Sequence, residues 1–567
     1  MPQSVIDNRK SQIANSKLGT RNSELRLGVF ICDCGGQIAR VVDTQALRQQ
    51  AAALPSVVYA ACDAYPCSPD GQARLRAAIT HQQLDRVLVA GCAPRLVGKL
   101  FRQAAQAAGL DGSCVQVANI REHCAYVHAG DGAAATDKAA SLVEMGVANL
   151  AAASLASSHT GRIVKSALVV GGELSGLAAA LALADNDIAV TLVERADRLG
   201  GSPRELAASL AEKAAAHPHI HVLLGAHLAG VTGRPGDYHA RIVRDDQGVT
   251  VAAGALLVAS GARAAGADGR PAPQDDVGVG QVAALLDLPQ DEAGFMIELR
   301  VRLRPGQYAD DGVYVLGSAH QPGDAASTLL QSYVTGARAL RFLSQPALTV
   351  QTPAARVEAA LCTGCGNCVP VCPAHAISLD KREDAPLPSG TLSLAGVDAL
   401  RCTGCGNCLV VCPPKAITLP GGGDAEILAQ ISAALARPAG RIVALACEWS
   451  AYAAADVAGA RRLSYPPGVR IIRLNCSARF DPYHILWAFL NGAQGVFLGA
   501  CPPGECHHGD GNRYAAQRVE ALKGQLAEHG IDPRRLRLEF LAGDDGEGFA
   551  RAVTEFCGAI STGATHL

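Results

Sequence analysis

The sequence predicts a multidomain fold, with an α/β domain at each end and, between them, a Rossmann-like domain followed by a small α+β domain. Three observations predict this fold class. Two cysteine runs of identical spacing lie past the middle of the 567-residue chain, a strand with a glycine-rich turn precedes them, and further cysteines follow apolar strands in both outer parts. A chain of this length is expected to form roughly three to five domains.

Eight of the 20 cysteines form the two runs, Cys362-Thr-Gly-Cys365-Gly-Asn-Cys368-Val-Pro-Val-Cys372-Pro and Cys402-Thr-Gly-Cys405-Gly-Asn-Cys408-Leu-Val-Val-Cys412-Pro. This is the bacterial two-cluster ferredoxin spacing, in which the fourth cysteine of each run ligates the other cluster. We therefore expect two [4Fe–4S] clusters, one on Cys362, Cys365, Cys368 and Cys412, the other on Cys402, Cys405, Cys408 and Cys372. Two structural zinc sites are the alternative, but zinc requires neither the crossed ligand nor the trailing proline. Residues 350–425 form this domain, and 381–397 is expected to be a surface loop or short hairpin.

Composition excludes several classes of function. The net charge is −2 and aromatic residues make up only 4% of the chain, which argues against a nucleic-acid surface. No uncharged apolar stretch is long enough to span a membrane. The polar residues 1–24 lack the apolar core of a secretory signal and are expected to be a disordered tail. Twenty cysteines without such a signal favour a cytoplasmic protein that binds metal.

Residues 25–150 are expected to form an α/β domain with a thiol site. Two predicted strands lead into cysteines, Leu27–Ile31 into Cys32 and Cys34, and Arg86–Ala90 into Cys92. Because α/β sheets bind ligands where their strands end, these cysteines are candidate ligands, and Cys67 and Cys124 join them. Cys62 and Cys114 are expected to be small buried hydrophobic residues.

Residues 160–345 carry a dinucleotide-binding pattern, consisting of strand Ala167–Val170, turn Gly171–Gly176, helix Leu177–Ala184, strand Ala189–Val193 and Glu194. In such a unit the helix N-terminus binds the pyrophosphate and the acidic residue binds the ribose. Two later strands end in glycine. We therefore expect bound FAD, with candidate contacts at Gly171, Gly172, Gly176, Glu194, Gly201, Gly261 and Gly317.

One position departs from this pattern. Glu173 replaces the middle glycine of G-x-G-x-x-G, where phosphate oxygens approach the backbone. An emptied dinucleotide fold kept as a scaffold is therefore the alternative to a flavin domain. Only one such turn occurs, so a separate nicotinamide domain and direct oxidation of NAD(P)H are not expected.

Residues 436–560 are expected to form a second α/β domain, with a parallel sheet whose strands end near cysteines: Arg441–Ala446 at Cys447, Val469–Leu474 at Cys476 and Gly495–Gly499 at Cys501. With Cys506, these thiolates suffice for one [2Fe–2S] cluster. A tetrahedral zinc site on the same four residues is the competing interpretation. His507 and His508 are expected to be neighbours rather than ligands, and Cys557 to be packed on a helix.

The chain after Leu25 resembles two families joined end to end. The first domain is similar to the N-terminal part of the heterodisulfide reductase A subunit, on Gly28-Val-Phe-Ile-Cys-Asp-Cys-Gly-Gly36, Tyr65-Pro-Cys-Ser68, Arg86-Val-Leu-Val-Ala-Gly-Cys-Ala-Pro-Arg95 and Ala118-Asn-Ile-Arg-Glu-His-Cys124. The next two domains look like the flavin and ferredoxin regions of that family. The last domain is similar to the delta subunit of methyl-viologen-reducing hydrogenase, on Arg470-Ile-Ile-Arg-Leu-Asn-Cys-Ser477 and Gly499-Ala-Cys-Pro-Pro-Gly-Glu-Cys-His507.

The resemblance implies FAD, several [4Fe–4S] clusters and a [2Fe–2S] cluster in the last domain. It also implies an N-terminal [4Fe–4S] cluster with candidate ligands Cys34, Cys67, Cys92 and Cys124, and with Cys32 in reserve. Proteins that resemble such a fusion occur as flavin subunits of electron-bifurcating heterodisulfide reductases and as the B subunit of the quinone-interacting membrane-bound oxidoreductase complex. The ferredoxin insertion that methanogen relatives carry in the flavin domain is missing here, because residues 199–260 contain no cysteine.

Three functions fit these observations. The first is an electron-transfer subunit of a multi-subunit cytoplasmic complex in sulfur metabolism, with a membrane-bound, quinone-reactive partner. The second is a protein whose FAD bifurcates electrons from a hydrogenase or formate dehydrogenase. The third is a scaffold that conducts through clusters alone, without flavin. No catalytic residue is assigned, because the cofactors carry the chemistry and other subunits supply and accept the electrons.

Overall fold

The computed structural model describes residues 25–563 apart from 156–158, 202–203, 246, 260–280, 284, 287–294, 297–311, 321–322, 351–352, 382–392 and 438–441. The predicted tail 1–24 lies outside these residues. The chain divides into two compact units. The first combines the residues up to Ser157 with those from Thr352 onward, and the second is Ser158–Gln351.

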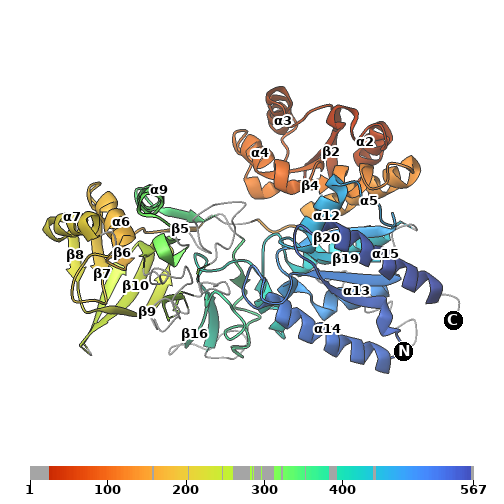
Figure 1. Cartoon of the computed structure of the whole chain (residues 1–567). Helices are drawn as coiled ribbons and strands as arrows, with labels where there is room; N and C mark the ends of the chain where they lie inside the picture. The colour runs from red at the N-terminus through yellow and green to blue at the C-terminus, as the bar shows by residue number, and fades with distance from the viewer. Residues whose placement is uncertain are drawn as a thin grey trace. The chain divides into compact units, whose positions relative to one another are not determined.

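The N-terminal domain of the first unit is a parallel sheet covered by helices, coloured red to orange in Figure 1. Its strands lie in the order β2-β1-β3-β4 and are β1 Leu27–Cys32, β2 Val57–Asp63, β3 Arg86–Gly91 and β4 Val115–Asn119. Its helices are α2 Thr44–Ala52, α3 Pro69–His81, α4 Pro94–Gln106 and α5 Gly132–Ala152. Every residue of β1 is buried, as expected for a parallel strand with helices on both faces. The carboxyl ends of all four strands therefore meet at one edge.

The C-terminal domain of the first unit repeats this plan. Its parallel strands lie in the order β20-β19-β21-β22 and are β19 Ile442–Cys447, β20 Val469–Leu474, β21 Gly495–Ala500 and β22 Leu536–Phe540. Its helices are α12 Ala451–Ala460, α13 Pro482–Leu490, α14 Gly511–Glu528 and α15 Gly546–Gly563. Cys447 is the last residue of β19, and Cys501 directly follows β21.

The ferredoxin segment consists of short antiparallel pairs. Strand β15 Arg356–Val357 pairs with β18 Ile417–Thr418, and β16 Ile377–Lys381 pairs with β17 Ser393–Val397. Helix α10 Asn407–Val411 lies within the second cysteine run, and α11 Asp424–Leu435 leads to the C-terminal domain. The connection predicted as a loop or hairpin is thus a hairpin whose tip lies outside the described residues.

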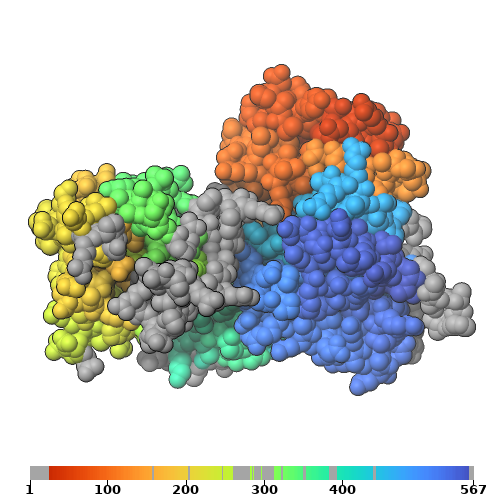
Figure 2. All heavy atoms as spheres, viewed as in Figure 1, coloured from red at the N-terminus to blue at the C-terminus, as the bar shows by residue number. Residues whose placement is uncertain are grey.

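One continuous core joins the parts of the first unit. It contains Leu142 of α5, Ile431 of α11 and Val443 of β19. Arg437, just after α11, donates to Glu144 and Asp137 of α5 at 2.7 and 2.9 Å. In Figure 2 the light-blue surface of α12 lies against the orange N-terminal domain. These contacts hold the ferredoxin segment and both outer domains in one body.

The second unit contains a parallel sheet with the order β13-β12-β6-β7-β8. The strands are β6 Ser166–Val170, β7 Ala189–Val193, β8 Ile220–Leu223, β12 Ala255–Val258 and β13 Val313–Val315. Helices α6 Leu174–Ala184, α7 Arg204–Ala216 and α9 Ala325–Leu343 accompany it, and β5 His159–Gly161 pairs with β14 Leu348–Val350. An antiparallel sheet of β9 His227–Arg234, β10 Asp237–Arg244 and β11 Gln247–Ala253 packs beside it.

All the strands predicted from apolar runs are present, within one to three residues at their ends. The prediction did not include β2, β4, β8 and β22, which are edge strands of their sheets. It also missed the antiparallel strands β5, β9, β10, β11, β14, β15 and β18. Polar residues interrupt the apolar sequences of β4 and β22, as is common in edge strands that are less completely covered. No helix among the described residues is long and apolar enough to cross a membrane.

Candidate metal and flavin centres

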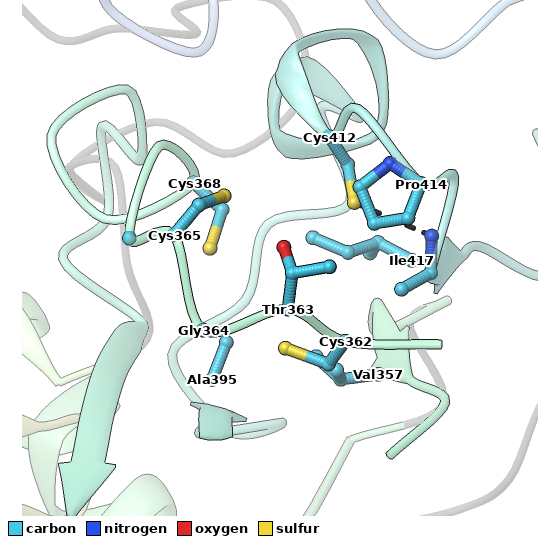
Figure 3. A pocket seen from close by; sticks show the side chains of 12 residues that line it. Val357, Cys362, Thr363, Gly364, Cys365, Cys368, Ala395, Cys412, Pro414 and Ile417 are labelled. Carbon is cyan, nitrogen blue, oxygen red and sulfur yellow. Dashed lines mark hydrogen bonds between the residues drawn. The ribbon is translucent and has the colours of Figure 1, made fainter. Parts of the chain in front are cut away.

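The first ferredoxin site consists of Cys362, Cys365, Cys368 and Cys412. All four line one small hollow, together with Val357, Pro414 and Ile417 (Figure 3). Burial raises the pKa of Cys368, and charges on the other three thiols add to the rise. The structure therefore brings the fourth cysteine of the second run to the first run, which is the crossed arrangement that the spacing predicts.

The second ferredoxin site consists of Cys402, Cys405, Cys408 and Cys372. Burial raises the pKa of Cys408 strongly, and the other three thiols of this site add to the rise. Cys368 of the first site also acts on Cys408, so the two sites are neighbours.

Backbone amides point at sulfur in both sites. The Ala416 amide donates to Cys412 Sγ at 3.3 Å, and the Ala376 amide donates to Cys372 Sγ at 3.3 Å. Glycines with left-handed backbone, φ 66° to 80°, stand between the first three cysteines of each run: Gly364, Gly366, Gly404 and Gly406. Side chains other than glycine are strained there, so the glycines allow the loop to wrap its amides around a metal cluster.

The C-terminal thiol site consists of Cys447, Cys476, Cys501 and Cys506, all buried. The Sγ atoms of Cys447 and Cys501 are 3.7 Å apart, and those of Cys476 and Cys506 are 3.9 Å apart. Hydrogen bonds from the Cys476 and Cys501 thiols lower the pKa of Cys447 and of Cys506 well below the usual range. The four sulfurs thus form a closed ring in which two favour the thiolate, the form that binds metal.

Helix α14 begins at this site. A Cβ added at Gly511, its first residue, would lie 2.5 Å from Cys476 Sγ and 3.2 Å from Cys506 Sγ. The positive end of the helix dipole therefore faces the thiolates. A tetrahedral Zn–S₄ centre, with bonds of about 2.3 Å, has sulfur–sulfur edges of about 3.8 Å. The two separations suit a pair of ligands on one tetrahedral metal, whether that metal is a single zinc or one iron of a cluster.

The second ferredoxin site and the C-terminal thiol site touch. Cys405 packs in one buried cluster with Cys476 and Cys506. Burial raises the pKa of Cys405 to about 11, and charge on Cys506 contributes to the rise. Asn475, just before Cys476, donates from Nδ2 to the Gly404 carbonyl at 3.1 Å. Together with the first ferredoxin site, these centres form a continuous row.

The N-terminal thiol site consists of Cys32, Cys34, Cys67 and Cys92. Burial raises the pKa of Cys32 strongly, and the other three thiols act on it. The Cys34 amide donates to Cys32 Sγ at 3.2 Å, and Arg121 Nη1 donates to Cys34 Sγ at 3.3 Å. Arg121 also pairs with the buried Glu122 at 2.6 Å.

Cys124, one of the expected ligands, is not brought to this site. It follows Arg121 on a short helical turn and faces the core instead, where it is fully buried. Burial raises its pKa to about 11, and the charged groups acting on it are Lys138 and Arg470. Cys32, held in reserve at the sequence level, takes the place next to the other thiols.

Cys62, Cys114 and Cys557 take part in none of these thiol sites, and His507 lies next to the C-terminal one. Cys62 is only half-buried, contrary to expectation, and donates to the Thr44 carbonyl at 3.2 Å. Cys114 is buried as expected and lies near Arg86. Cys557 packs against the core of the C-terminal domain. The His507 ring stacks on Trp449 at 3.8 Å.

In the second unit, the glycine-rich turn adopts the geometry that its pattern predicts. Gly171 has φ 111°, and a Cβ at Gly176 would lie 1.9 Å from the Gly171 carbonyl oxygen. A Cβ at Gly317 would lie 2.4 Å from Ser175 Oγ, so the β13 strand end meets the start of α6. Both glycines permit backbone approach that any side chain would block.

Glu194 folds back onto this turn. Its carboxylate accepts from the Gly172 amide at 2.5 Å and from the Ala196 amide at 2.8 Å. Glu173 is exposed just before α6. A Cβ added at Gly201 would lie 3.2 Å from the Cβ of Glu173. The acidic side chain therefore stands at the mouth of the turn, beside a second candidate contact. Gly261 lies outside the described residues.

A group of Asp424, Asp481 and His484 also lies close together. Its carboxylates are already paired. Asp481 accepts from Lys415 at 2.6 Å and from Arg479 at 3.4 Å, and Asp424 pairs with Arg479 and with His484 at 2.9 Å. These cations occupy the positions that a metal ion would take, so the group is a charge network rather than a metal centre.

Three protein families match parts of the chain. "Methyl-viologen-reducing hydrogenase, delta subunit" matches residues 442–562. "4Fe-4S dicluster domain" matches residues 361–416, which include both cysteine runs. "Pyridine nucleotide-disulphide oxidoreductase" matches residues 130–274, which include the glycine-rich turn.

Individual relatives extend these matches over the chain. The A subunit of ferredoxin:CoB-CoM heterodisulfide reductase from Methanosarcina mazei is 24% identical and aligns over 94% of this chain and 96% of its own length. The iron-sulfur D subunit of F420-non-reducing hydrogenase from Archaeoglobus profundus is 47% identical over 21% of this chain and 87% of its own length. The chain is a homologue of the heterodisulfide reductase A subunit, fused to a domain of the hydrogenase delta-subunit family.

This homologue of the heterodisulfide reductase A subunit is an oxidoreductase, and its iron–sulfur and flavin domains give it an electron-transfer role. A third relative, the second iron-sulfur A subunit of CoB–CoM heterodisulfide reductase from Methanopyrus kandleri, is 38% identical over 39% of this chain and 35% of its own length. The Methanosarcina alignment runs over 780 positions, more than the 567 residues present here, so that relative carries segments that this chain lacks.

Proposed function

We propose that this protein carries electrons between partner subunits of a redox complex, through two [4Fe–4S] clusters in the ferredoxin segment and further clusters in the outer α/β domains. The observation that carries the proposal is the buried contact of Cys405 with Cys476 and Cys506. Electron transfer slows steeply with distance, so ligands in contact favour rapid exchange between the second ferredoxin site and the C-terminal thiol site. The protein supplies the ligands, amide hydrogen bonds and burial that set each potential.

Metal analysis and EPR on anaerobically purified, full-length protein test this proposal. We expect two reducible [4Fe–4S] signals per chain from the ferredoxin segment, and fewer than two would overturn it. Crossed ligation adds a sharper requirement. Cys412→Ser should remove the cluster signal of the first ferredoxin site, and Cys372→Ser that of the second, although each lies in the other run.

For the C-terminal thiol site we propose a [2Fe–2S] cluster. Its support is the contact with a redox site and the ring of four sulfurs, which provides one pair for each of two irons. Zinc is the alternative, because the same separations suit one tetrahedral ion. Iron, sulfide and zinc content of wild type and Cys501→Ser separate the two: loss of two irons and two sulfides favours the cluster, and loss of one zinc excludes it.

For the N-terminal thiol site we propose a further [4Fe–4S] cluster on Cys32, Cys34, Cys67 and Cys92. Its support is the mutual proximity of these thiols and the two donors, the Cys34 amide and Arg121, that already point at sulfur. Such hydrogen bonds stabilise a reduced cluster. The test is the iron lost from variants at this site, described with the predictions below.

For the second unit we propose bound FAD. The turn around Gly171, the carboxylate of Glu194 and the strand end at Gly317 occupy the positions that such a cofactor requires. Bound flavin would accept and release electrons there, while these residues bind and orient it. Because Glu173 places negative charge beside the pyrophosphate position, Glu173→Gly should strengthen flavin retention during purification. Wild-type protein without flavin, even when FAD is supplied, would instead favour the conducting scaffold.

We infer that the complex lies on the cytoplasmic side of the membrane and passes electrons to a quinone-reactive membrane subunit in sulfur metabolism. The absence of disulfides among the 20 cysteines supports a reducing compartment. The rival function is electron bifurcation from a hydrogenase or formate dehydrogenase, and the fused domain of the hydrogenase delta-subunit family favours it. The one-electron potentials of the flavin decide between them. Crossed potentials indicate bifurcation, and ordered potentials indicate simple transfer.

A further inference from the structure

Arg518 on helix α14 lies between the second ferredoxin site and the C-terminal thiol site. Its Nη2 donates to Asn407 Oδ1 at 2.7 Å, and its Nη1 donates to the Ala478 carbonyl at 3.0 Å. Asn407 belongs to the second ferredoxin run, and Ala478 follows Cys476 by two residues. One guanidinium therefore connects the ligand loops of two different sites.

The same network reaches the crossed ligand of the second site. Asn407 is buried, and its Nδ2 donates to the Val371 carbonyl at 3.0 Å. Val371 directly precedes Cys372. Because Asn407 accepts from Arg518 and donates to Val371, both halves of the second ferredoxin site are tied to α14.

The charge of Arg518 is not balanced by any ion pair among the described residues. Its hydrogen-bond acceptors are all neutral oxygens, on Asn407, Ala478 and Tyr514. Of the charged residues, Asp481 and Arg479 act on Arg518. They belong to a network that is already matched, in which Asp424 and Asp481 pair with Arg479 and Lys415. Arg518 therefore adds one positive charge in excess, and an arginine keeps that charge at any ordinary pH.

We propose that Arg518 is a positioning residue that raises the reduction potentials of the second ferredoxin site and the C-terminal thiol site together. The inference rests on the proposed function, because it requires redox-active metal at these sites. Reduction adds negative charge to a cluster, and a nearby positive charge away from bulk water stabilises that state. Cys405 on one side and Cys476 on the other both interact electrostatically with Arg518, so both sites should respond in the same direction.

The experiment is a potentiometric titration of full-length protein followed by EPR, comparing wild type with Arg518→Met, Arg518→Gln and Arg518→Lys. Both neutral variants should lower the two potentials together while the line shapes stay unchanged. Arg518→Lys restores the charge and should return both potentials toward wild type. The reduction potential of the first ferredoxin site should shift less, so this site serves as an internal reference. Arg534→Met is the matched control, because the Arg534 side chain is 79% exposed. This variant should change none of the reduction potentials.

Each other outcome overturns a defined statement. Wild type without redox-active iron at the second ferredoxin site overturns the proposed function, and the inference falls with it. If Arg518→Met and Arg518→Gln keep their clusters but neither reduction potential changes, the inference fails while the proposed function stands. The same holds if both sites contain iron and only one potential shifts. If the C-terminal thiol site holds zinc, the joint shift is excluded. Loss of iron from both neutral variants and from Arg518→Lys would show that Arg518 only supports the fold, which also overturns it.

Discussion

The two outer α/β domains have the same strand order but gather their thiols differently. In both, a cysteine ends the first strand of the domain and another follows the third: Cys32 and Cys92 in one, Cys447 and Cys501 in the other. In the C-terminal domain the four sulfurs form a ring with separations of 3.7 and 3.9 Å. In the N-terminal domain Arg121 also enters the group and donates to Cys34 at 3.3 Å.

The difference shows that the strand ends of each sheet bring three cysteines to one edge, while a loop contributes the fourth. Cys506 lies in the loop after β21, whereas Cys34 lies just after β1. After β4 the N-terminal chain makes a short helical turn that directs Arg121 toward the thiols and Cys124 toward the core. The same topology therefore provides a thiol site in each domain. Among the residues that the structure describes, a cation donates a hydrogen bond to a site sulfur only in the N-terminal domain.

Loss of one sulfur from the C-terminal ring should have the largest effect. Cys501→Ser is expected to release all metal from this site, because Cys501 contacts both Cys447 and Cys506. The ferredoxin clusters should keep their EPR signals. Metal content together with EPR checks this expectation. A variant that keeps its full metal content would show that Cys501 is not needed to hold metal at this site.

The N-terminal site can be tested with two cysteines of the same domain. Cys32→Ser should remove about one cluster's worth of iron, about four atoms per chain. Cys124→Ser, the matched control, should leave the iron content unchanged because its side chain faces the core. Iron loss from Cys124→Ser but not from Cys32→Ser would contradict the ligand set proposed for this domain.

The joint between the two domains buries Lys138, which lies 4.5 Å over the Tyr465 ring and 3.1 Å from His128 Nε2. Burial lowers the pKa of Lys138 from 10.5 to about 7. The folded state therefore binds this proton more weakly than the unfolded state. The contribution to stability is complete above pH 10.5 and is lost as the pH falls to about 7.

Lys138→Met should remove this pH dependence and stabilise the protein at neutral pH by on the order of a few kcal/mol. Thermal melting at several pH values between neutral and alkaline measures the change. An unchanged slope in the variant would show that Lys138 does not titrate in that window.

The contact of α14 with the C-terminal ring gives the smallest expected effect. Gly511→Ala places a methyl group 2.5 Å from Cys476 Sγ and should destabilise the C-terminal domain by about 1–3 kcal/mol. Gly524→Ala on the same helix meets no atom within 4 Å and should stabilise it by about 1 kcal/mol. Chemical denaturation of both variants tests the pair, and equal effects would mean that Gly511 does not pack on the sulfurs.

The predictive value of the sequence differed between regions for physical reasons. In the ferredoxin segment, spacing alone predicted which four thiols come together at each site, because three of them lie within seven residues and the glycines between them fix the loop. In the C-terminal domain, strand ends predicted the meeting of Cys447, Cys476 and Cys501. In the N-terminal domain strand ends pointed to Cys32, Cys34 and Cys92, but the family resemblance preferred Cys124 to Cys32. An irregular turn after β4, which neither argument could predict, directs Cys124 toward the core.

The sequence by itself determined the domain order, the grouping of the ferredoxin cysteines and the strand ends where the other cysteines gather, because these follow from local spacing and apolar runs. Only the tertiary structure decided which thiols meet across loops, that Cys405 touches the C-terminal thiol site, and that Arg518 stands between two centres. The contacts of Cys405 and Arg518 join residues about 40 to 110 positions apart. No local pattern encodes them, because they arise when separate elements pack into one core.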